Sequence, residues 1–279
     1  MSIYDDINYG IDIYKVDDAR KDLRRVKEYF QSQPYHNRAM EAFLIEHRQL
    51  PESCIKDLDA FFILEDQDID ELPDWLIAEP MGMLKRGHLT YAGRVVFPVK
   101  SPKGEIMGFI GWEPFDKPKY LDSDNYGYKA KVSTFFGMEN LPEYYTDDKP
   151  IFITEGLMCT AWLRANGFHA MASLGSVLSK YCINILKRFG NRCYIVPDND
   201  EAGLNFLNQV RYALPQARKI MVRNFTVTAK KAMGDGTIEE REEITKDIEQ
   251  LRLYYEEELL EDLRNLDNPS YRLKVLIRV

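Results

Sequence analysis

The sequence predicts an α/β protein whose second half forms a parallel sheet, with a mixed α+β lobe before it and a helical tail after it. From residue 150 onward, apolar runs of strand length alternate with stretches of helical spacing. The resulting order, βαβαβαβ, is typical of a parallel sheet with right-handed crossovers. We expect a charged helical arm at residues 1–35 and the mixed lobe at 36–147. The parallel-sheet domain should follow at 148–236, and the helical tail at 237–279.

The segment before the sheet combines helices with a β-hairpin. The stretch DDARKDLRRVKEYFQSQP predicts a solvated helix that Pro34 stops, because proline lacks the N–H needed to continue it. Residues 35–57 have the apolar spacing of two short helices separated by Leu50-Pro51. The β-rich runs RVVFPV and EIMGFIGWE follow, and the turn KSPKGE between them predicts a hairpin.

The four strands expected in the second half are PIFITEG, FHAMASLGS, RCYIVPDND and RKIMVRN. Gly167 and Gly190 lie where the intervening helices should end, which favours the left-handed residue that commonly terminates a helix. After the fourth strand, Thr237 and Glu240 have the spacing of a capping box. They predict a charged helix or helix pair that continues to about Asn265.

Composition narrows the class of protein. The net charge of −8, from 37 Lys and Arg against 45 Asp and Glu, argues against a chain that coats nucleic acid, although a local basic groove could still bind it. No apolar run is long enough for a membrane helix and no secretory signal is evident, so we expect a cytoplasmic protein. The 4 cysteines have no CxxC pairing, which predicts reduced, buried thiols.

Three acids follow two of the predicted strands. Glu155 ends one strand, and Asp198 and Asp200 end another. Ligands gather at the carboxyl ends of parallel strands, and three converging carboxylates would repel one another and raise one another's pKa. A divalent cation such as Mg²⁺ would relieve this repulsion. The alternative is that Asp200 caps the following helix and Glu155 caps its own.

These motifs resemble the Toprim domain that bacterial-type primases, topoisomerases and some nucleases share. The resemblance covers roughly residues 148 to 235. It rests on Glu155-Gly156, Leu174-Gly175, Asp198-Asn199-Asp200 and Ala202-Gly203.

The upstream half resembles the polymerase core of bacterial-type primases. RVVFPVKSPKGEIMGFIG is similar to their Arg-apolar-apolar-Phe-Pro-Ile and Gly-Phe-x-Gly motifs, and KPKYLDSD to their Pro-Lys-Tyr-Leu-Asn-Ser. YKAKVSTFFGMENL resembles the lysine that precedes their Leu-Tyr-Gly-Leu, and AMEAFLIEHRQLPESCIKDL resembles the helical start of the core. The order of these motifs ahead of a Toprim domain indicates a DNA primase.

The resemblance implies a nucleotidyltransferase, a DNA-directed RNA polymerase that makes short RNA primers on single-stranded DNA from ribonucleoside triphosphates during DNA replication. The implied site uses Mg²⁺ or Mn²⁺ held by acids, and basic residues that line a groove for template and nucleotide phosphates. The acids are Glu155, Asp198, Asp200 and Asp235, and the basic residues are Arg94, Lys119 and Lys131. Because the sequence shows neither a zinc module nor a Walker A loop, we expect a replicative helicase or a separate zinc-binding, template-recognition protein as partner.

The chain also departs from the family pattern. Cys159 stands where many primases have an acid, while Trp112 and Ala92 stand where they have arginines. The late Lys-Asp-Pro-Asp-like motif is represented by AKKAMGD, with Asp235 as its one acid. Three hypotheses follow: a divergent primase of phage or plasmid type, a Toprim nuclease in which the same acids activate water, and a non-catalytic DNA-binding or regulatory protein. The primase-like block at 94–137 argues against the nuclease.

Overall fold

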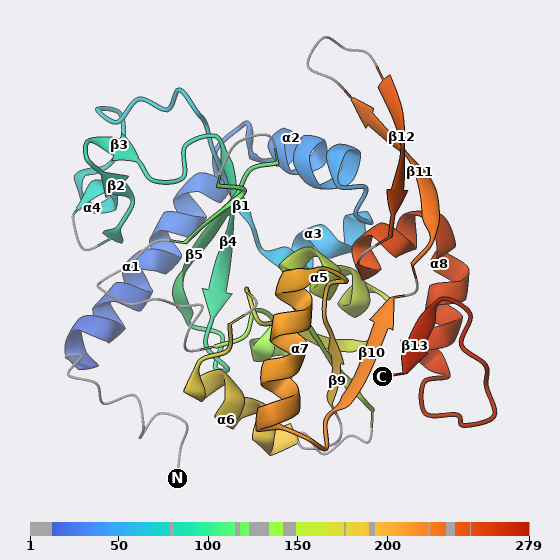
Figure 1. The fold of residues 1–279 in the computed structure, drawn as a ribbon. Coiled ribbons are helices and arrows are strands. Elements are labelled where there is room, and N and C mark those ends of the chain that lie inside the picture. Colours follow the sequence, from blue (N-terminus) through green and yellow to red (C-terminus); the bar gives the residue numbers. More distant parts are fainter. Residues whose placement is uncertain are drawn as a thin grey trace. The chain divides into compact units, whose positions relative to one another are not determined.

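The computed structural model divides into two compact units, Met1–Glu143 and Tyr144–Val279 (Figure 1). The predicted boundary at residue 147 lies close to this division, and the boundaries at 35 and 236 stay predictions. The structure describes residues 13–78, 81–114, 118–122, 134–141, 149–175, 177–189, 193–222, 224–232, 238–245 and 247–278.

The first unit contains an antiparallel sheet of order β1-β4-β5-β6. Its strands are β1 (Phe61–Ile63), β4 (Arg94–Lys100), β5 (Ile106–Trp112) and β6 (Tyr120–Asp122), and a second small sheet pairs β2 (Leu84–Lys85) with β3 (His88–Leu89). The helices are α1 (Ile13–Gln31), α2 (His36–Met40), the π-helix η1 (Glu41–His47), α3 (Glu52–Leu58), α4 (Asp74–Ile77) and the 3-10 helix η4 (Met138–Asn140). The predicted hairpin is β4–β5, and the two predicted short helices are the run α2–η1 and α3.

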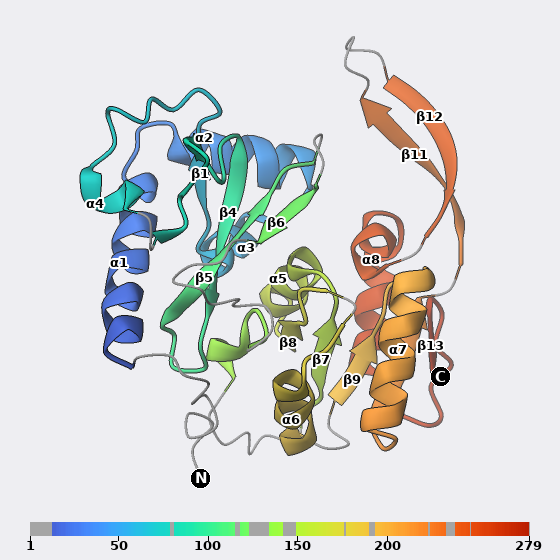
Figure 2. The ribbon, with the colours of Figure 1, turned by 60° about the vertical axis from the view of Figure 1, so that its left-hand side comes forward.

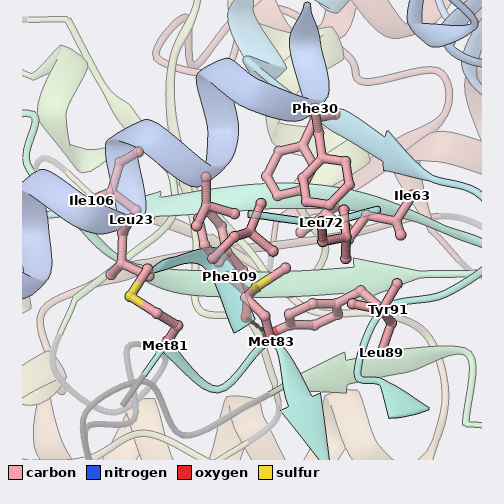
Figure 3. Packing of buried hydrophobic residues seen from close by; sticks show 14 residues of the cluster. Leu23, Phe30, Ile63, Leu72, Met81, Met83, Leu89, Tyr91, Ile106 and Phe109 are labelled. Atoms are coloured by element: carbon pink, nitrogen blue, oxygen red, sulfur yellow. Dashed lines mark hydrogen bonds between the residues drawn. The ribbon is translucent and has the colours of Figure 1, made fainter. Parts of the chain in front are cut away.

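The helix α1 packs on this sheet through an apolar stripe. Leu23, Val26 and Phe30 recur at helical spacing and are buried. The Phe30 ring stacks on Phe61 of β1 at 5.5 Å between centroids, and Phe61 meets Phe109 of β5 edge to face at 5.2 Å. Figure 3 shows side chains from α1 and from the strands gathered in one core. The predicted solvated arm therefore has only one solvated face, and its other face belongs to the core of the first unit.

The second unit is built on the predicted parallel sheet. Strands β7 (Ile151–Thr154), β8 (His169–Ala172), β9 (Cys193–Val196) and β10 (Arg218–Val222) alternate with helices α5 (Leu157–Ala165), α6 (Lys180–Phe189) and α7 (Glu201–Ala213). The sheet order is β13-β10-β9-β7-β8, and β7 pairs in parallel with both β8 and β9. All residues of β7 and β9 are buried, as expected for strands covered on both faces. The βαβαβαβ prediction is confirmed.

The end of a helix at Gly167 is also confirmed, because Gly167 follows α5 with φ of 82°. Gly190 lies outside the described residues.

The predicted helix beginning at Thr237 is wrong over residues 238–244. These residues form β12 (Ile238–Ile244), which pairs antiparallel with β11 (Thr226–Ala232) in a two-stranded ribbon. Both views show the ribbon extending away from α7 and α8 of its unit (Figures 1 and 2). The predicted charged helix exists as α8, Ile248–Arg264, with a kink at Tyr255. Thr237 itself lies outside the described residues.

A short strand that the sequence did not predict, β13 (Leu276–Arg278), pairs antiparallel with β10 at the edge of the sheet. It is held by Asp262, a buried residue of α8. The Asp262 carboxylate accepts hydrogen bonds from the backbone N–H groups of Lys274, Val275 and Leu276 at 2.8–3.0 Å. A buried carboxylate surrounded by backbone donors is satisfied, so this acid has a structural task.

Cys54, Cys159, Cys182 and Cys193 are all free and buried, which confirms the prediction for the thiols. Within the part of the chain that the structure describes, no helix is long and apolar enough to cross a membrane.

Candidate active site

Glu155 lies directly after β7 and reaches toward the neighbouring strand. Its Oε1 accepts a hydrogen bond of 3.0 Å from the backbone N–H of Asp198, which follows β9. The residue that caps α5 is Gly156, and no side chain makes a capping bond there. The alternative that Glu155 caps its own helix is therefore wrong. Because β7 and β9 are neighbours in the sheet, two residues that are far apart in sequence meet at its carboxyl edge.

Asp200 does cap the following helix. Its Oδ1 accepts a hydrogen bond of 2.9 Å from the backbone N–H of Gly203 in the first turn of α7. This bond satisfies one of the donors that a helix start leaves unpaired. The cap uses one carboxylate oxygen and fixes the direction of the side chain. The cap therefore leaves the second oxygen of Asp200 for another role.

Gly203 lets α7 lie against the backbone of Asp198. A Cβ atom built on Gly203 would lie 1.9 Å from the carbonyl oxygen of Asp198 and 2.9 Å from its nitrogen. Contacts this short do not occur, so only glycine fits at this position. The Ala202-Gly203 pair thus has a physical reason: it brings the start of α7, with its Asp200 cap, next to the segment that carries Asp198.

Leu174 and Gly175 lie beside Glu155 at the end of β8. The backbone N–H of Leu174 donates to the carbonyl oxygen of Glu155 at 3.2 Å. Leu174 has a φ of 60°, a left-handed conformation that is uncommon for a leucine. The third part of the motif therefore supports the loop that presents the glutamate.

The electrostatics of Glu155 agree with the expected repulsion between carboxylates. Burial raises the pKa of Glu155, and the negative charge of Asp200 raises it further. The hydrogen bond from the Asp198 N–H opposes both effects and does not cancel them. The ionised form of Glu155 is consequently less favoured than that of an exposed glutamate, and a nearby positive charge would favour it.

Two acids that the sequence analysis missed, Asp247 and Glu249, act electrostatically on Cys159 of α5. Burial raises the pKa of the Cys159 thiol well above its usual range, and nearby negative charges raise it further. Those charges belong to Asp247, Glu249 and Asp198. Asp247 also caps α8, since its Oδ1 accepts from Gln250 N at 2.6 Å.

The sequence held a signal for these two acids. The stretch KDIEQL at 246–251, which follows the β11–β12 ribbon, begins Lys-Asp-x-Glu and so resembles the Lys-Asp-Pro-Asp motif in its lysine and the positions of its two acids. The predicted representative of this motif, Asp235, lies outside the described residues.

The donor set fits a divalent cation that is held weakly. Within the described residues, no group of three or more His, Cys, Asp or Glu side chains is arranged to hold a metal ion. The donors near Glu155 are nevertheless hard carboxylate oxygens, the ligands that Mg²⁺ prefers. Mg²⁺ is commonly held by one or two carboxylates, with waters and substrate phosphates completing its shell. The residues therefore suit Mg²⁺ or Mn²⁺ bound together with a phosphate-bearing ligand.

Arg94 and Lys119, two of the predicted basic residues, lie in the first unit. Arg94 is buried, with 6% of its surface exposed, and its Nη1 donates to the carbonyl oxygen of Pro118 at 2.9 Å. Lys119, the next residue, is exposed. Arg94 thus holds the segment that presents Lys119, a role that the sequence did not suggest. Lys131 lies outside the described residues.

Comparisons with known proteins agree with the motifs. Residues 152–234 match a family model described as Toprim-like. A DNA primase of Aquifex aeolicus (strain VF5) is 32% identical over 113 residues, which are 39% of this chain and 23% of that protein. A DNA primase of Clostridium acetobutylicum is 36% identical over 115 residues, which are 40% of this chain and 19% of that protein. The match thus spans about a fifth of the length of these curated relatives.

Solved structures share the fold over most of the chain. The zinc-binding and RNA polymerase domains of the Aquifex aeolicus primase superpose with a TM-score of 0.68 at 22% identity, covering 94% of this chain and 64% of that chain. A DnaG primase catalytic domain bound to single-stranded DNA gives a TM-score of 0.66 at 21% identity, covering 91% of this chain and 80% of that one. The chain therefore contains a Toprim-like domain, has the fold of the DNA primase catalytic core, and has DNA primases as its homologues in sequence.

Proposed function

We propose that the protein is a primase that synthesises short RNA primers on single-stranded DNA during replication. The observation that carries this proposal is the bond between Glu155 and the Asp198 backbone, with Asp200 close enough to raise the pKa of Glu155. It joins the carboxyl ends of two neighbouring parallel strands into one acidic site. Homology to DNA primases supports the same reaction.

In this proposal Glu155, Asp198 and Asp200 hold Mg²⁺ or Mn²⁺ together with the phosphates of a ribonucleoside triphosphate. The metal would neutralise phosphate charge and polarise the attacking 3′-hydroxyl. The chain's own contribution is preorganisation. The Asp198 N–H holds one oxygen of Glu155, and the Gly203 N–H holds one oxygen of Asp200. The carboxylates of Glu155 and Asp200 are therefore oriented before the substrate binds.

Asp247 and Glu249 strengthen the catalytic form of the proposal. Cys159 by itself favours a non-catalytic relative, because a buried thiol with a raised pKa is a poor replacement for a carboxylate. The two acids act electrostatically on that thiol and so supply negative charge near it. We therefore place the non-catalytic DNA-binding protein second and the nuclease third.

The proposal extends to partners. Lys119 and Lys131 would contact template or nucleotide phosphates, and Arg94 would keep Lys119 in place. A replicative helicase, or a separate zinc-binding protein that recognises the template, would direct the enzyme to its start sites. We propose a phage- or plasmid-type enzyme that acts in the cytoplasm.

The test is primer synthesis by purified protein on single-stranded DNA, with labelled ribonucleotides and Mg²⁺ or Mn²⁺. Short new products that disappear in Glu155→Gln but persist in Glu257→Gln would support the proposal, because Glu257 is an exposed acid on α8. Degraded template without new products would support the nuclease. DNA binding with neither product would support the non-catalytic protein.

A further inference from the structure

Three buried hydroxyl side chains lie at the loop that carries Glu155. Thr154 ends β7, Thr160 belongs to α5, and Ser173 directly follows β8. All three are buried, with exposed fractions of 3% or less. A buried hydroxyl costs free energy unless it is hydrogen-bonded, so the partners of these three groups show what holds the loop.

Thr154 forms a bridge from one side of Glu155 to the other. Its Oγ1 donates a hydrogen bond of 3.0 Å to the carbonyl oxygen of Gly156, two residues later. Thr160 Oγ1 lies 2.8 Å from Thr154 Oγ1. A hydroxyl has a single proton, and the Thr154 proton goes to a carbonyl, which can only accept. The proton between the two threonines therefore belongs to Thr160, and the bonds run in one direction from Thr160 through Thr154 to Gly156.

The end of β8 supplies further bonds to the same loop. Ser173 N–H donates to Thr154 O at 2.9 Å, and Leu174 N–H donates to Glu155 O at 3.2 Å. The Ser173 hydroxyl donates to Gly175 O at 2.8 Å, across the residue that has the left-handed conformation, Leu174. Such a conformation is costly for a leucine and persists only where its surroundings fix it. Ser173 therefore helps to keep the Leu174 N–H directed at Glu155.

The backbone is consequently fixed on both sides of the acid. The carbonyl oxygens of three consecutive residues, Thr154, Glu155 and Gly156, all accept hydrogen bonds. With the backbone held, the Glu155 side chain turns only about its own torsions. The Asp198 N–H then selects the orientation in which Oε1 lies 3.0 Å from it.

The choice of partners favours a role in positioning over the mere satisfaction of buried hydroxyls. A threonine in a helix commonly donates to the carbonyl four residues earlier, which for Thr160 is Gly156 O. The Thr160 hydroxyl instead bonds to Thr154, while its backbone N–H donates to Gly156 O at 3.3 Å. The helix thus gives its hydroxyl to the strand that presents Glu155.

We propose that Thr154, Thr160 and Ser173 are positioning residues, which hold the Glu155 carboxylate in the orientation that binds a divalent cation. The inference rests on the proposed function, because it takes Glu155 as a metal ligand. The three hydroxyls act through the backbone and do not themselves contact the metal. A carboxylate that is held in advance loses less conformational freedom when the cation arrives, so the site binds the cation more tightly.

The first readout is hydrogen exchange of the Asp198 amide in the full chain, measured in chelator. Valine has nearly the shape of threonine and lacks the hydroxyl. In the Thr154→Val protein, Thr160 can turn to donate to Gly156 O, so the Thr154→Val/Thr160→Val double variant decides. Its Asp198 amide should exchange about tenfold faster than in wild type, because the Glu155 acceptor is no longer held. The Thr154→Ser protein, which keeps the hydroxyl, should exchange like wild type.

The second readout is Mn²⁺ affinity, measured by electron paramagnetic resonance with a non-hydrolysable ribonucleoside triphosphate present. The double variant should bind Mn²⁺ several-fold more weakly, and Thr154→Ser should bind it like wild type. Thr90→Val is the matched control, because the Thr90 hydroxyl also donates to a glycine carbonyl, Gly82 O at 2.8 Å, and lies in the first unit. This control should lower the unfolding midpoint, as the loss of a hydroxyl bond does, and leave both readouts unchanged.

Unchanged Asp198 exchange in the double variant would overturn the inference, as would unchanged Mn²⁺ affinity or a wild-type protein that binds no Mn²⁺. If the double variant does not fold, Ser173→Ala decides through the same affinity measurement, with the Leu174 amide as the exchange probe. Neither readout depends on catalysis. Absent primer synthesis, together with faster exchange and weaker Mn²⁺ binding in the double variant, would therefore refute the proposed function and support this inference.

Discussion

Replacing Gly203 with alanine tests whether the acidic site depends on the close approach of α7 to Asp198. Alanine stabilises a helix interior by about 1 kcal/mol relative to glycine, so propensity alone predicts a more stable protein. The new Cβ would lie 1.9 Å from Asp198 O, and the atom it meets belongs to the backbone and cannot rotate away. Overpacking of this kind typically costs about 1–3 kcal/mol.

We expect the clash to exceed the gain in propensity, so that Gly203→Ala lowers the free energy of unfolding by up to about 2 kcal/mol. The shift of Asp198 should also break its 3.0 Å bond to Glu155, and primer synthesis should fall with it. Urea unfolding and primer synthesis measured on the same preparation check both effects. Asn205→Ala, an exposed substitution on α7, controls for helix propensity. A Gly203→Ala protein as stable and active as wild type would refute the reasoning.

The remaining predictions concern single charges. In chelator, wild type should lose stability as pH rises through the raised pKa of Glu155, because the folded protein binds that proton more tightly than the unfolded chain. The Glu155→Gln protein should not show this loss, and parallel pH profiles of the two proteins would contradict the prediction. Burial raises the pKa of Asp59, but bonds from Lys27 at 2.7 Å and Lys100 at 2.9 Å outweigh it and lower the pKa. Asp59→Asn should therefore lose about 1–2 kcal/mol at neutral pH, a difference that disappears as acid protonates the wild-type carboxyl below its ordinary pKa. Asp247→Asn should abolish primer synthesis while leaving single-strand binding intact, and retained synthesis would reduce Asp247 to a helix cap.

The sheet and most of its acidic site could be predicted because their signals are local. A buried parallel strand is a short apolar run, and Glu155 and Asp198 each follow such a run directly. Gly203 was part of a recognisable motif, but the sequence did not show why a glycine is required at this position. Only the folded backbone shows that a Cβ there would meet Asp198.

The β11–β12 ribbon could not be predicted from local patterns. Its second strand, IEEREEI, consists largely of residues that favour helices, and neither of its faces is apolar. The strand forms through antiparallel pairing with β11, which lies earlier in the chain. In this pairing Glu240 lies opposite Lys230 and Glu239 lies opposite Lys231. Because the ribbon was missed, the acids beyond it were missed as well.

The Asp262 carboxylate has a consequence for the dynamics of the second unit. It accepts the amide protons of Lys274, Val275 and Leu276 from a position inside α8. Those three protons can exchange with solvent only when the carboxylate is pulled away from them, and that requires the helix to open or shift. The amides of residues 274–276, which lead into the edge strand β13, should therefore exchange slowly and lose protection together with the last turn of α8.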